Sequence, residues 1–131
     1  PAPPPATEYL FSVTLDTAPP TVLGQTPLGQ RIFGPIQGGT FSGPDLQGKW
    51  PLCGLDSGLG DADGHFNPDV VYLLQTDDGA TVLVREQGHA PNVVLLFETA
   101  SGGAYDWLNG VVAYGLAAQN GDQVSVDVWK V

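Results

Sequence analysis

Residues 31–57 read RIFGPIQGGTFSGPDLQGKWPLCGLDS. Glycines and prolines recur throughout this stretch and divide it into short apolar runs. Glycine at this density in β-structure marks bulges, tight corners or places where a ligand approaches the backbone. The stretch also contains Arg31 and Lys49, the first two basic residues of the chain. It therefore predicts both a sharply bent β-sheet and the place where a functional site would begin.

The same alternation of apolar runs and turn residues extends through the rest of the chain, which is typical of an all-β domain. Residues 8–15 alternate strictly, and we expect their odd-numbered apolar side chains, Tyr9 among them, to share one face. Residues 106–116 would also fit a short helix, but their adjacent valines and their glycines favour a strand. The expected strands cover residues 8–15, 21–25, 38–41, 49–55, 70–74, 80–85, 92–99, 106–116 and 123–131.

Roughly eight to ten strands at this spacing are typical of β-sandwiches and β-barrels. A closed barrel leaves no exposed sheet edge, and a barrel of about eight strands has room for one small ligand. We therefore predict a single antiparallel β-barrel, lipocalin-like in size, over residues 8–131. Residues 1–7, PAPPPAT, are expected to form a flexible Pro-rich tail.

The charge of the chain restricts its partners. Four lysines and arginines stand against fourteen aspartates and glutamates, which gives a formal net charge of -10. Nucleic acids and anionic membranes bind clustered cations, so both are excluded as expected partners. A small apolar or aromatic metabolite is the expected partner, and a homo-oligomer of the chain is a further expectation.

Cysteine content, the length of apolar runs and the first residue of the chain bear on the location of the protein. Cys53 is the only cysteine, so no intrachain disulfide can form, and this favours a reducing compartment. No apolar run approaches the roughly 20 residues of a membrane-spanning helix. The chain starts at Pro1, which fits either removal of the initiator methionine or removal of a longer leader. A cytoplasmic location is favoured, and secretion is the alternative if a leader was removed before Pro1.

Three patterns that suggest a cofactor or a metal are incomplete. Residues 43–49 have the spacing of a phosphate-binding loop, but Trp50 follows where that loop needs serine or threonine. Residues 59–70 resemble a calcium loop only in their middle part, because the first and twelfth positions are apolar. His65 and His89 could join a carboxylate in an open metal site, although surface histidines are the favoured interpretation. We expect no metal and no cofactor.

Charged residues that border the apolar strands are the candidates for chemistry. A carboxylate inside a barrel has a raised pKa and can act as an acid or a base. An arginine at the mouth would bind a carboxylate, phenolate or enolate of a ligand. The alternative is that these groups form structural salt bridges at the barrel ends. The candidates are Arg31, Lys49, Asp56, Asp69, Arg85 and Glu98.

Several motifs, in order and at matching spacing, resemble one known family from about Tyr9 to the end of the chain. They are Gly29-x-Arg31, Pro35-Ile36-x-Gly38-Gly39-Thr40-Phe41-x-Gly43-Pro44-x-Leu46-x-Gly48, Gly54-x-Asp56, Thr76-Asp77-Asp78-Gly79-Ala80, Phe97-Glu98-Thr99 and Tyr105-x-Trp107-Leu108-Asn109. The sequence is similar to the family called DUF3237, also known as UPF0311.

The resemblance implies a small antiparallel β-barrel, in agreement with the strand pattern, and an enzyme or a binding protein of small-molecule metabolism. It implies no settled activity. The chain departs from the family pattern at residues 53–57, and at Val71, where the family usually has arginine. If that arginine pairs with a carboxylate of the site in the family, the pocket of this chain is built differently.

Our leading hypothesis is a cofactor-independent enzyme that performs acid–base chemistry of isomerase, cyclase or lyase type on an apolar metabolite. Asp56 would be the general acid or base, and Arg31 would stabilise negative charge on the substrate. The alternatives are a non-catalytic ligand-binding barrel and a structural or oligomer-forming protein. The expected catalytic residues are Asp56, Arg31 and Tyr72, and the expected substrate-binding residues are Trp107, Asn109, Tyr105, Lys49 and Asp69.

Overall fold

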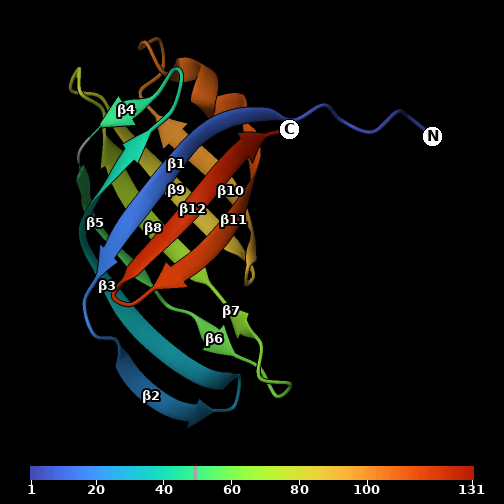
Figure 1. Cartoon of the computed structure of the whole chain (residues 1–131), viewed down its shortest axis with the longest axis vertical. Coiled ribbons are helices and arrows are strands. Elements are labelled where there is room, and N and C mark those ends of the chain that lie inside the picture. The colour runs from blue at the N-terminus through green and yellow to red at the C-terminus, as the bar shows by residue number, and fades with distance from the viewer. Residues whose placement is uncertain (49) are drawn as a thin grey trace.

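Eight antiparallel strands form a closed barrel in the computed structural model (Figure 1). The structure describes residues 1–48 and 50–131, without the side chains of residues 50–52. The strands follow one another around the wall in the order β1, β12, β11, β10, β9, β8, β5 and β3, and β1 pairs with β3 to close it. The predicted antiparallel barrel is confirmed. Its strands are β1 (Glu8–Thr17), β3 (Gly29–Ser42), β5 (Trp50–Asp56), β8 (Asp69–Gln75), β9 (Thr81–His89), β10 (Asn92–Thr99), β11 (Val112–Asn120) and β12 (Gln123–Lys130).

The glycine-rich stretch lets the barrel close. Gly39 of β3 has a φ of +147°, and a Cβ atom at this position would lie 1.9 Å from the carbonyl oxygen of Thr14 in β1. Only glycine allows so close an approach of the two backbones. Gly39 therefore permits the close approach of β1 and β3 at the place where the barrel closes.

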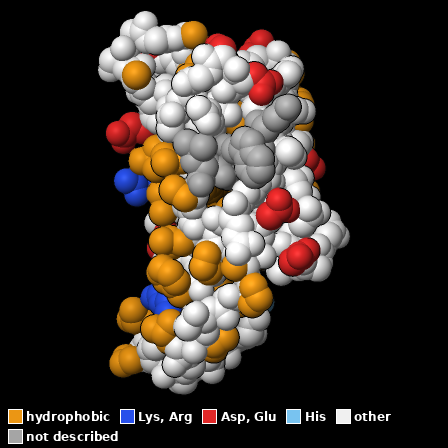
Figure 2. All heavy atoms as spheres, turned by 90° about the vertical axis from the view of Figure 1, so that its left-hand side faces the viewer, with side chains coloured by type: hydrophobic (Ala, Val, Ile, Leu, Met, Phe, Trp, Pro, Cys, Tyr) orange, Lys and Arg blue, Asp and Glu red, His pale blue; other side chains and the backbone are white. Residues whose placement is uncertain are grey.

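One end of the barrel carries an extension, drawn at the bottom of Figure 1. The first part of β3 runs beyond the wall and pairs with β2 (Thr21–Thr26) on one side and β6 (Leu59–Gly60) on the other. Strand β7 (Phe66–Asn67) pairs with β6. Figure 2 shows hydrophobic side chains gathered over this lower part of the molecule. The most exposed of them are Val22, Leu23, Leu28 and Phe33.

The barrel interior is the hydrophobic core, and it follows the period-two pattern of the strands. Phe11, Val13 and Leu15 of β1 point inward and are buried, as predicted. The prediction for Tyr9 is wrong, because the register of β1 against β12 shifts between Tyr9 and Phe11. This bulge turns Leu10 inward and leaves the Tyr9 side chain 42% exposed.

The opposite end of the barrel, at the top of Figure 1, is covered by a short 3-10 helix, η1 (Asp106–Gly110). The strand predicted for residues 106–116 is therefore wrong in its first half, and β11 begins only at Val112. Leu108 of η1 is fully buried and packs into the core. Asn109 holds the helix against β10, because its Oδ1 accepts the Thr99 N–H at 2.8 Å and its Nδ2 donates to the Thr99 carbonyl at 3.1 Å.

The short strand β4 (Gln47–Gly48) pairs with the end of β3 near this covered end. Residues 1–7 precede the first strand and are exposed. The part of the chain that the structure describes contains no helix that is long and apolar enough to span a membrane.

Candidate active site

A cavity of about 310 Å³ lies in the end of the barrel that faces the extension. Its wall is mainly apolar and comes from strands on all sides, with Leu15 from β1, Ile32 and Ile36 from β3, and Val124 from β12. A largely apolar cavity with a few polar groups is the usual form of a small-molecule site. The polar groups of this cavity therefore decide what it can do.

Two carboxyl groups, those of Asp56 and Glu86, line the cavity. Asp56 pairs with Val70 across β5 and β8, and Val70 pairs with Glu86 across β8 and β9. Residues directly opposite one another on paired strands point to the same side of a sheet, so all three side chains face the interior. Neighbouring strands lie about 4.8 Å apart, which places the two carboxyl-bearing residues roughly 10 Å apart along the wall.

Glu86 is the more deeply buried of the pair, with 3% of its surface exposed. The hydroxyl of Tyr72 donates a hydrogen bond to its Oε1 at 3.1 Å. Loss of water around the carboxyl raises the pKa of Glu86 to about 7, and the negative charge of Asp56 adds to this effect. The Tyr72 hydrogen bond acts in the opposite direction, because it stabilises the carboxylate. Glu86 can therefore give or take a proton near neutral pH.

Asp56 lies at the border of the cavity and is partly exposed. Burial raises the pKa of this carboxyl above its ordinary value, and the charge of Asp69 raises it further. The backbone N–H of Asp69 donates to Asp56 Oδ1 at 3.2 Å, which lowers the pKa and fixes the side chain at the start of β8. Asp56 and Glu86 thus differ in solvation within one cavity, a common arrangement for an acid–base pair.

Tyr72 depends on a glycine in the neighbouring strand. Gly54 of β5 pairs with Tyr72 of β8, and a Cβ atom at Gly54 would lie 2.5 Å from the Tyr72 Cβ. It would also lie 2.7 Å from the carbonyl oxygen of Val71. The missing side chain at Gly54 therefore lets the tyrosine pack where its hydroxyl can reach Glu86.

The structure brings together only part of the predicted site. Tyr72 donates a hydrogen bond to Glu86, and the charge of Asp56, in the same cavity, raises the pKa of Glu86. Arg31 does not join them, because it alternates with Ile32 on β3 and points to the outside, where its Nη1 donates to the Ser57 carbonyl at 2.6 Å. The Asp69 side chain also points outward and accepts a hydrogen bond from Gln87 at 3.1 Å. Arg31 and Asp69 line a separate, open hollow on the outer surface.

Three of the predicted substrate-binding residues, Tyr105, Trp107 and Asn109, lie at the other end of the barrel. Trp107 and Asn109 belong to η1, and the hydroxyl of Tyr105 donates to Asp78 at 3.0 Å beside the β8–β9 turn. Glu86 lines the cavity and lies near the end of β9 that is remote from the β8–β9 turn. Lys49 lies outside the described residues, so its prediction stays open.

Glu86 is the residue that the sequence predictions missed. The expected strand stopped at Arg85, the first charge after the apolar run, whereas β9 continues to His89. Val82 and Val84 are inward-facing, and the period of two places Glu86 on the same face. The alternation of residues 82–86 therefore predicts a buried carboxyl at Glu86 if the strand is extended beyond Arg85.

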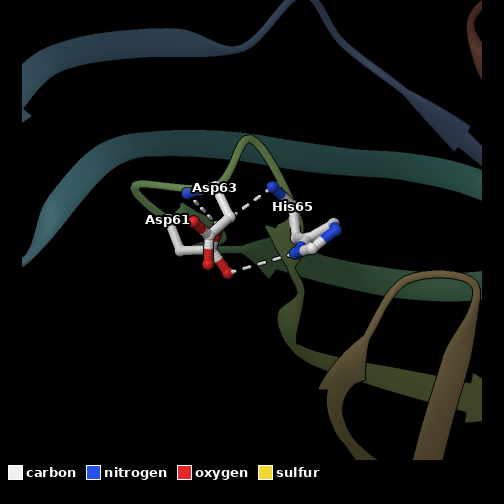
Figure 3. Close-up of side chains that lie close together, drawn as sticks. All are labelled: Asp61, Asp63 and His65. Atoms are coloured by element: carbon white, nitrogen blue, oxygen red, sulfur yellow. Dashed lines mark hydrogen bonds and ion pairs between the residues drawn. The ribbon is translucent and has the colours of Figure 1, made fainter.

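One group of side chains outside the cavity could hold a cation. The ligand atoms of Asp61, Asp63 and His65 all lie within 4.8 Å of one another, in the turn between β6 and β7 (Figure 3). Asp61 Oδ1 already accepts the backbone N–H groups of Asp63 and His65, each at 3.0 Å. These hydrogen bonds lower the pKa of Asp61 and are sufficient to explain the turn without a metal.

Comparison with known proteins identifies relatives along the whole chain. A family model described as "Protein of unknown function (DUF3237)" matches residues 5–93. A protein of Penicillium herquei named "Hydroalkoxylation enzyme phnH" is 34% identical over 128 residues, which cover 98% of this chain and 85% of that protein. A "UPF0311 protein" of Rhodopseudomonas palustris is 27% identical, with 95% of both chains covered.

Solved structures show the same barrel. A crystal structure of a "beta-barrel like protein" from Acinetobacter baumannii superimposes with a TM-score of 0.90 at 33% identity, over 98% of each chain. A crystal structure of an enzyme from Penicillium herquei superimposes with a TM-score of 0.89 at 33% identity, over 99% of this chain and 96% of that one. One of these relatives is thus an enzyme, and it shares nearly the full length of the barrel.

Proposed function

The chain belongs to the DUF3237 family, and we propose that it is an acid–base enzyme acting on an apolar small molecule held in the barrel cavity. The observation that carries the proposal is the placement of two carboxyl groups, Asp56 and Glu86, in one largely apolar cavity. Burial raises the pKa of both groups. Structural carboxylates are more often exposed or paired with cations, whereas raised pKa values in a cavity are typical of acid–base sites.

The relative from Penicillium herquei suggests the type of reaction. Hydroalkoxylation is the addition of an alcohol O–H bond across a carbon–carbon double bond. Such an addition within one molecule closes a cyclic ether and changes no oxidation state overall, so it needs only one proton donor and one proton acceptor. Cyclisation of a hydroxy-alkene is therefore our preferred reaction, and isomerisation and elimination use the same two groups.

Glu86 and Asp56 would divide the proton transfers between them. Protonated Glu86 gives its proton to one alkene carbon, and the π electrons form the new C–H bond. The substrate oxygen attacks the other alkene carbon and forms the C–O bond, while its O–H proton passes to the Asp56 carboxylate. Return of that proton from Asp56 to Glu86 through solvent restores the starting state. Tyr72 holds the Glu86 carboxyl in place through its hydrogen bond to Oε1.

The reaction can be tested in D₂O with ortho-alkenylphenols that carry a trisubstituted double bond, since protonation of such a bond gives the more stable tertiary cation. We expect the wild-type chain to form the cyclic ether with one deuterium on carbon, detected by mass spectrometry. Glu86→Gln and Asp56→Asn should each lower the rate at least about 100-fold, the usual contribution of a general acid or base. Glu98→Gln, a change of an exposed glutamate on β10, is the matched control.

The non-catalytic binding barrel is the second candidate, because an apolar cavity of about 310 Å³ can hold a ligand without any reaction. The two functions give different results. A binding protein would retain the alkenylphenol unchanged and without deuterium on carbon, equally in the wild type and in Glu86→Gln. That result would refute the enzymatic proposal.

A further inference from the structure

We infer that the cavity selects ligands by charge, and that it binds an apolar molecule carrying one protonated amine more tightly than the matched neutral or anionic molecule. This inference rests on the same cavity as the proposed function but does not require turnover. It follows from the distribution of charged side chains around the cavity wall.

Among the described residues, the charged side chains that line the cavity are all acidic. Within residues 1–48 and 53–131, its wall includes the carboxyl groups of Asp56 and Glu86 and no lysine or arginine side chain. Arg31 points outward and binds the Ser57 carbonyl. Arg85 is exposed, because it alternates with the inward-facing Val84 and Glu86. The side chain of Lys130 lies outside the barrel, 3.4 Å from Glu8.

One oxygen of the deeper carboxyl is available to a ligand. Among the described residues, Glu86 has a single hydrogen-bond partner, the Tyr72 hydroxyl on Oε1. Its Oε2 has none, although the residue is only 3% exposed and lines the cavity. A buried charge without an opposite charge is unfavourable, and a cation placed beside it removes most of this cost. The free Oε2 is thus positioned to accept a hydrogen bond from an ammonium group.

The groups around Glu86 support the same conclusion. Tyr72 hydrogen-bonds to Glu86 and Val70 pairs with it from β8, while Asp56 of β5, Gly34 and Ile36 of β3, and Ala117 and Gln119 of β11 line the same cavity. The only titratable neighbours in this set are an acid and a phenol. Binding of an ammonium group should therefore favour the ionised form of Glu86, and the preference for the amine should increase as pH rises through about 7.

This preference also connects to the proposed reaction. Protonation of an alkene develops positive charge on carbon, and a cavity whose described charged groups are all carboxyls would stabilise that charge. A protonated amine would mimic it in the ground state. An apolar amine should therefore act as a ligand even if the chain performs no reaction on alkenes.

Isothermal titration calorimetry of the full chain with 4-phenylbutylamine, 4-phenylbutan-1-ol and 4-phenylbutanoate provides the test. The three probes share one apolar body and differ only in charge. At pH 8 we expect the amine to bind at least tenfold more tightly than the alcohol, a difference of about 1.4 kcal/mol, and the carboxylate to bind most weakly. At pH 5.5 the difference between amine and alcohol should fall below about threefold, since Glu86 is then protonated.

The variants Glu86→Gln and Asp56→Asn should each reduce the preference for the amine at pH 8, and Glu98→Gln should leave it unchanged. Two independent carboxyl variants keep the test informative if one of them fails to fold. Absence of amine binding, tighter binding of the carboxylate, or a preference that persists in both folded variants would overturn the inference. Binding of the amine without turnover of alkenylphenols would refute only the proposed reaction.

Discussion

The hydroxyl of Tyr72 on β8 donates a 3.1 Å hydrogen bond to Oε1 of Glu86 on β9, with both side chains buried in the barrel. Two opposing influences meet at this contact. Burial favours the neutral carboxylic acid, and the hydrogen bond favours the carboxylate. The balance between them keeps the pKa of Glu86 at about 7 rather than higher, where the group could no longer exchange protons near neutral pH.

Removal of this hydroxyl should raise the pKa of Glu86 further. In Tyr72→Phe the carboxylate loses its donor while its burial is unchanged, so the acid form becomes more favourable. Carbon-13 NMR titration of the Glu86 carboxyl would show the change. At pH 8 the variant should also lose about 1.5–3 kcal/mol of stability, the usual contribution of a hydrogen bond to a charged group.

Tyr114→Phe is the matched control for that change. Tyr114 donates to Asn92 at 2.7 Å on the exposed surface of the barrel. Loss of this hydrogen bond should lower the free energy of unfolding by no more than about 1 kcal/mol and should leave the pKa of Glu86 unchanged. A Glu86 pKa that is equal in wild type and Tyr72→Phe would show that the hydrogen bond has no influence on the acid.

The raised pKa of Glu86 should make the protein less stable at high pH. The folded-state pKa of about 7 exceeds the ordinary value of 4.5, so between these values the folded state holds a proton that the unfolded chain has released. The stabilising contribution is complete below about pH 4.5 and is lost as pH rises through about 7, with a total of about 3 kcal/mol.

Urea unfolding of wild type and Glu86→Gln at pH 5 and pH 8 would measure this loss. The neutral amide cannot ionise, so the variant should gain stability relative to the wild type by up to about 3 kcal/mol between the two pH values. Comparison of the two proteins cancels the contributions of the other carboxyl groups. A constant difference in stability between pH 5 and pH 8 would contradict a raised pKa.

Substitution of Gly54 should disturb the site through packing alone. A methyl group at this position would lie 2.5 Å from the Tyr72 Cβ and 2.7 Å from the Val71 carbonyl oxygen, so β5 and β8 must move apart. We expect Gly54→Ala to destabilise the fold by about 1–3 kcal/mol in thermal unfolding. Gly110→Ala is the control, because a Cβ there has no neighbour within 4 Å. Equal melting temperatures for the two variants would contradict the close packing.

Ligand binding in the cavity should not depend on the covered end of the barrel. Trp107 is 39% exposed, and its ring lies 5.5 Å from Lys130 Nζ. We expect Trp107→Ala to change the affinity for 4-phenylbutylamine less than about twofold, whereas Ala117→Phe, which fills the cavity, should abolish measurable binding. A large loss of affinity in Trp107→Ala would point to a site at the opposite end.

The strand pattern was sufficient to predict the barrel, because its period of two and its turn residues are local signals. Residues 92–99 were predicted as the strand that β10 forms. The errors arose where a long-range contact overrides the local pattern. Tyr9 turns outward because β1 shifts its register against β12, a partner more than 100 residues away. The first half of residues 106–116 forms a helix because Leu108 is buried over the end of the core.

The candidate site could be predicted only in part, for a related reason. The types of Asp56 and Tyr72 and their positions beside apolar strands predict them as site residues, but the pairing that places Asp56, Val70 and Glu86 in one row depends on the register of three strands. A single strand does not reveal its inward face when both faces carry charges. Arg31 was expected beside Asp56 on sequence grounds, and the outward direction of its side chain becomes visible only once Ile32 is known to face the cavity.

Strand β3 belongs to both the barrel and the extension. Its second part pairs with β1 and closes the barrel, and its first part pairs with β2 and β6 in the extension. The row of Asp56, Val70 and Glu86 lies in the barrel wall, while Pro20, Ile32 and Phe66 line the same cavity from the extension. Insertions or deletions at the tips of the extension would leave the register of the wall unchanged. Under the proposed function, changes in the extension would therefore reshape the lining of the cavity and alter the choice of substrate without displacing the two carboxyl groups.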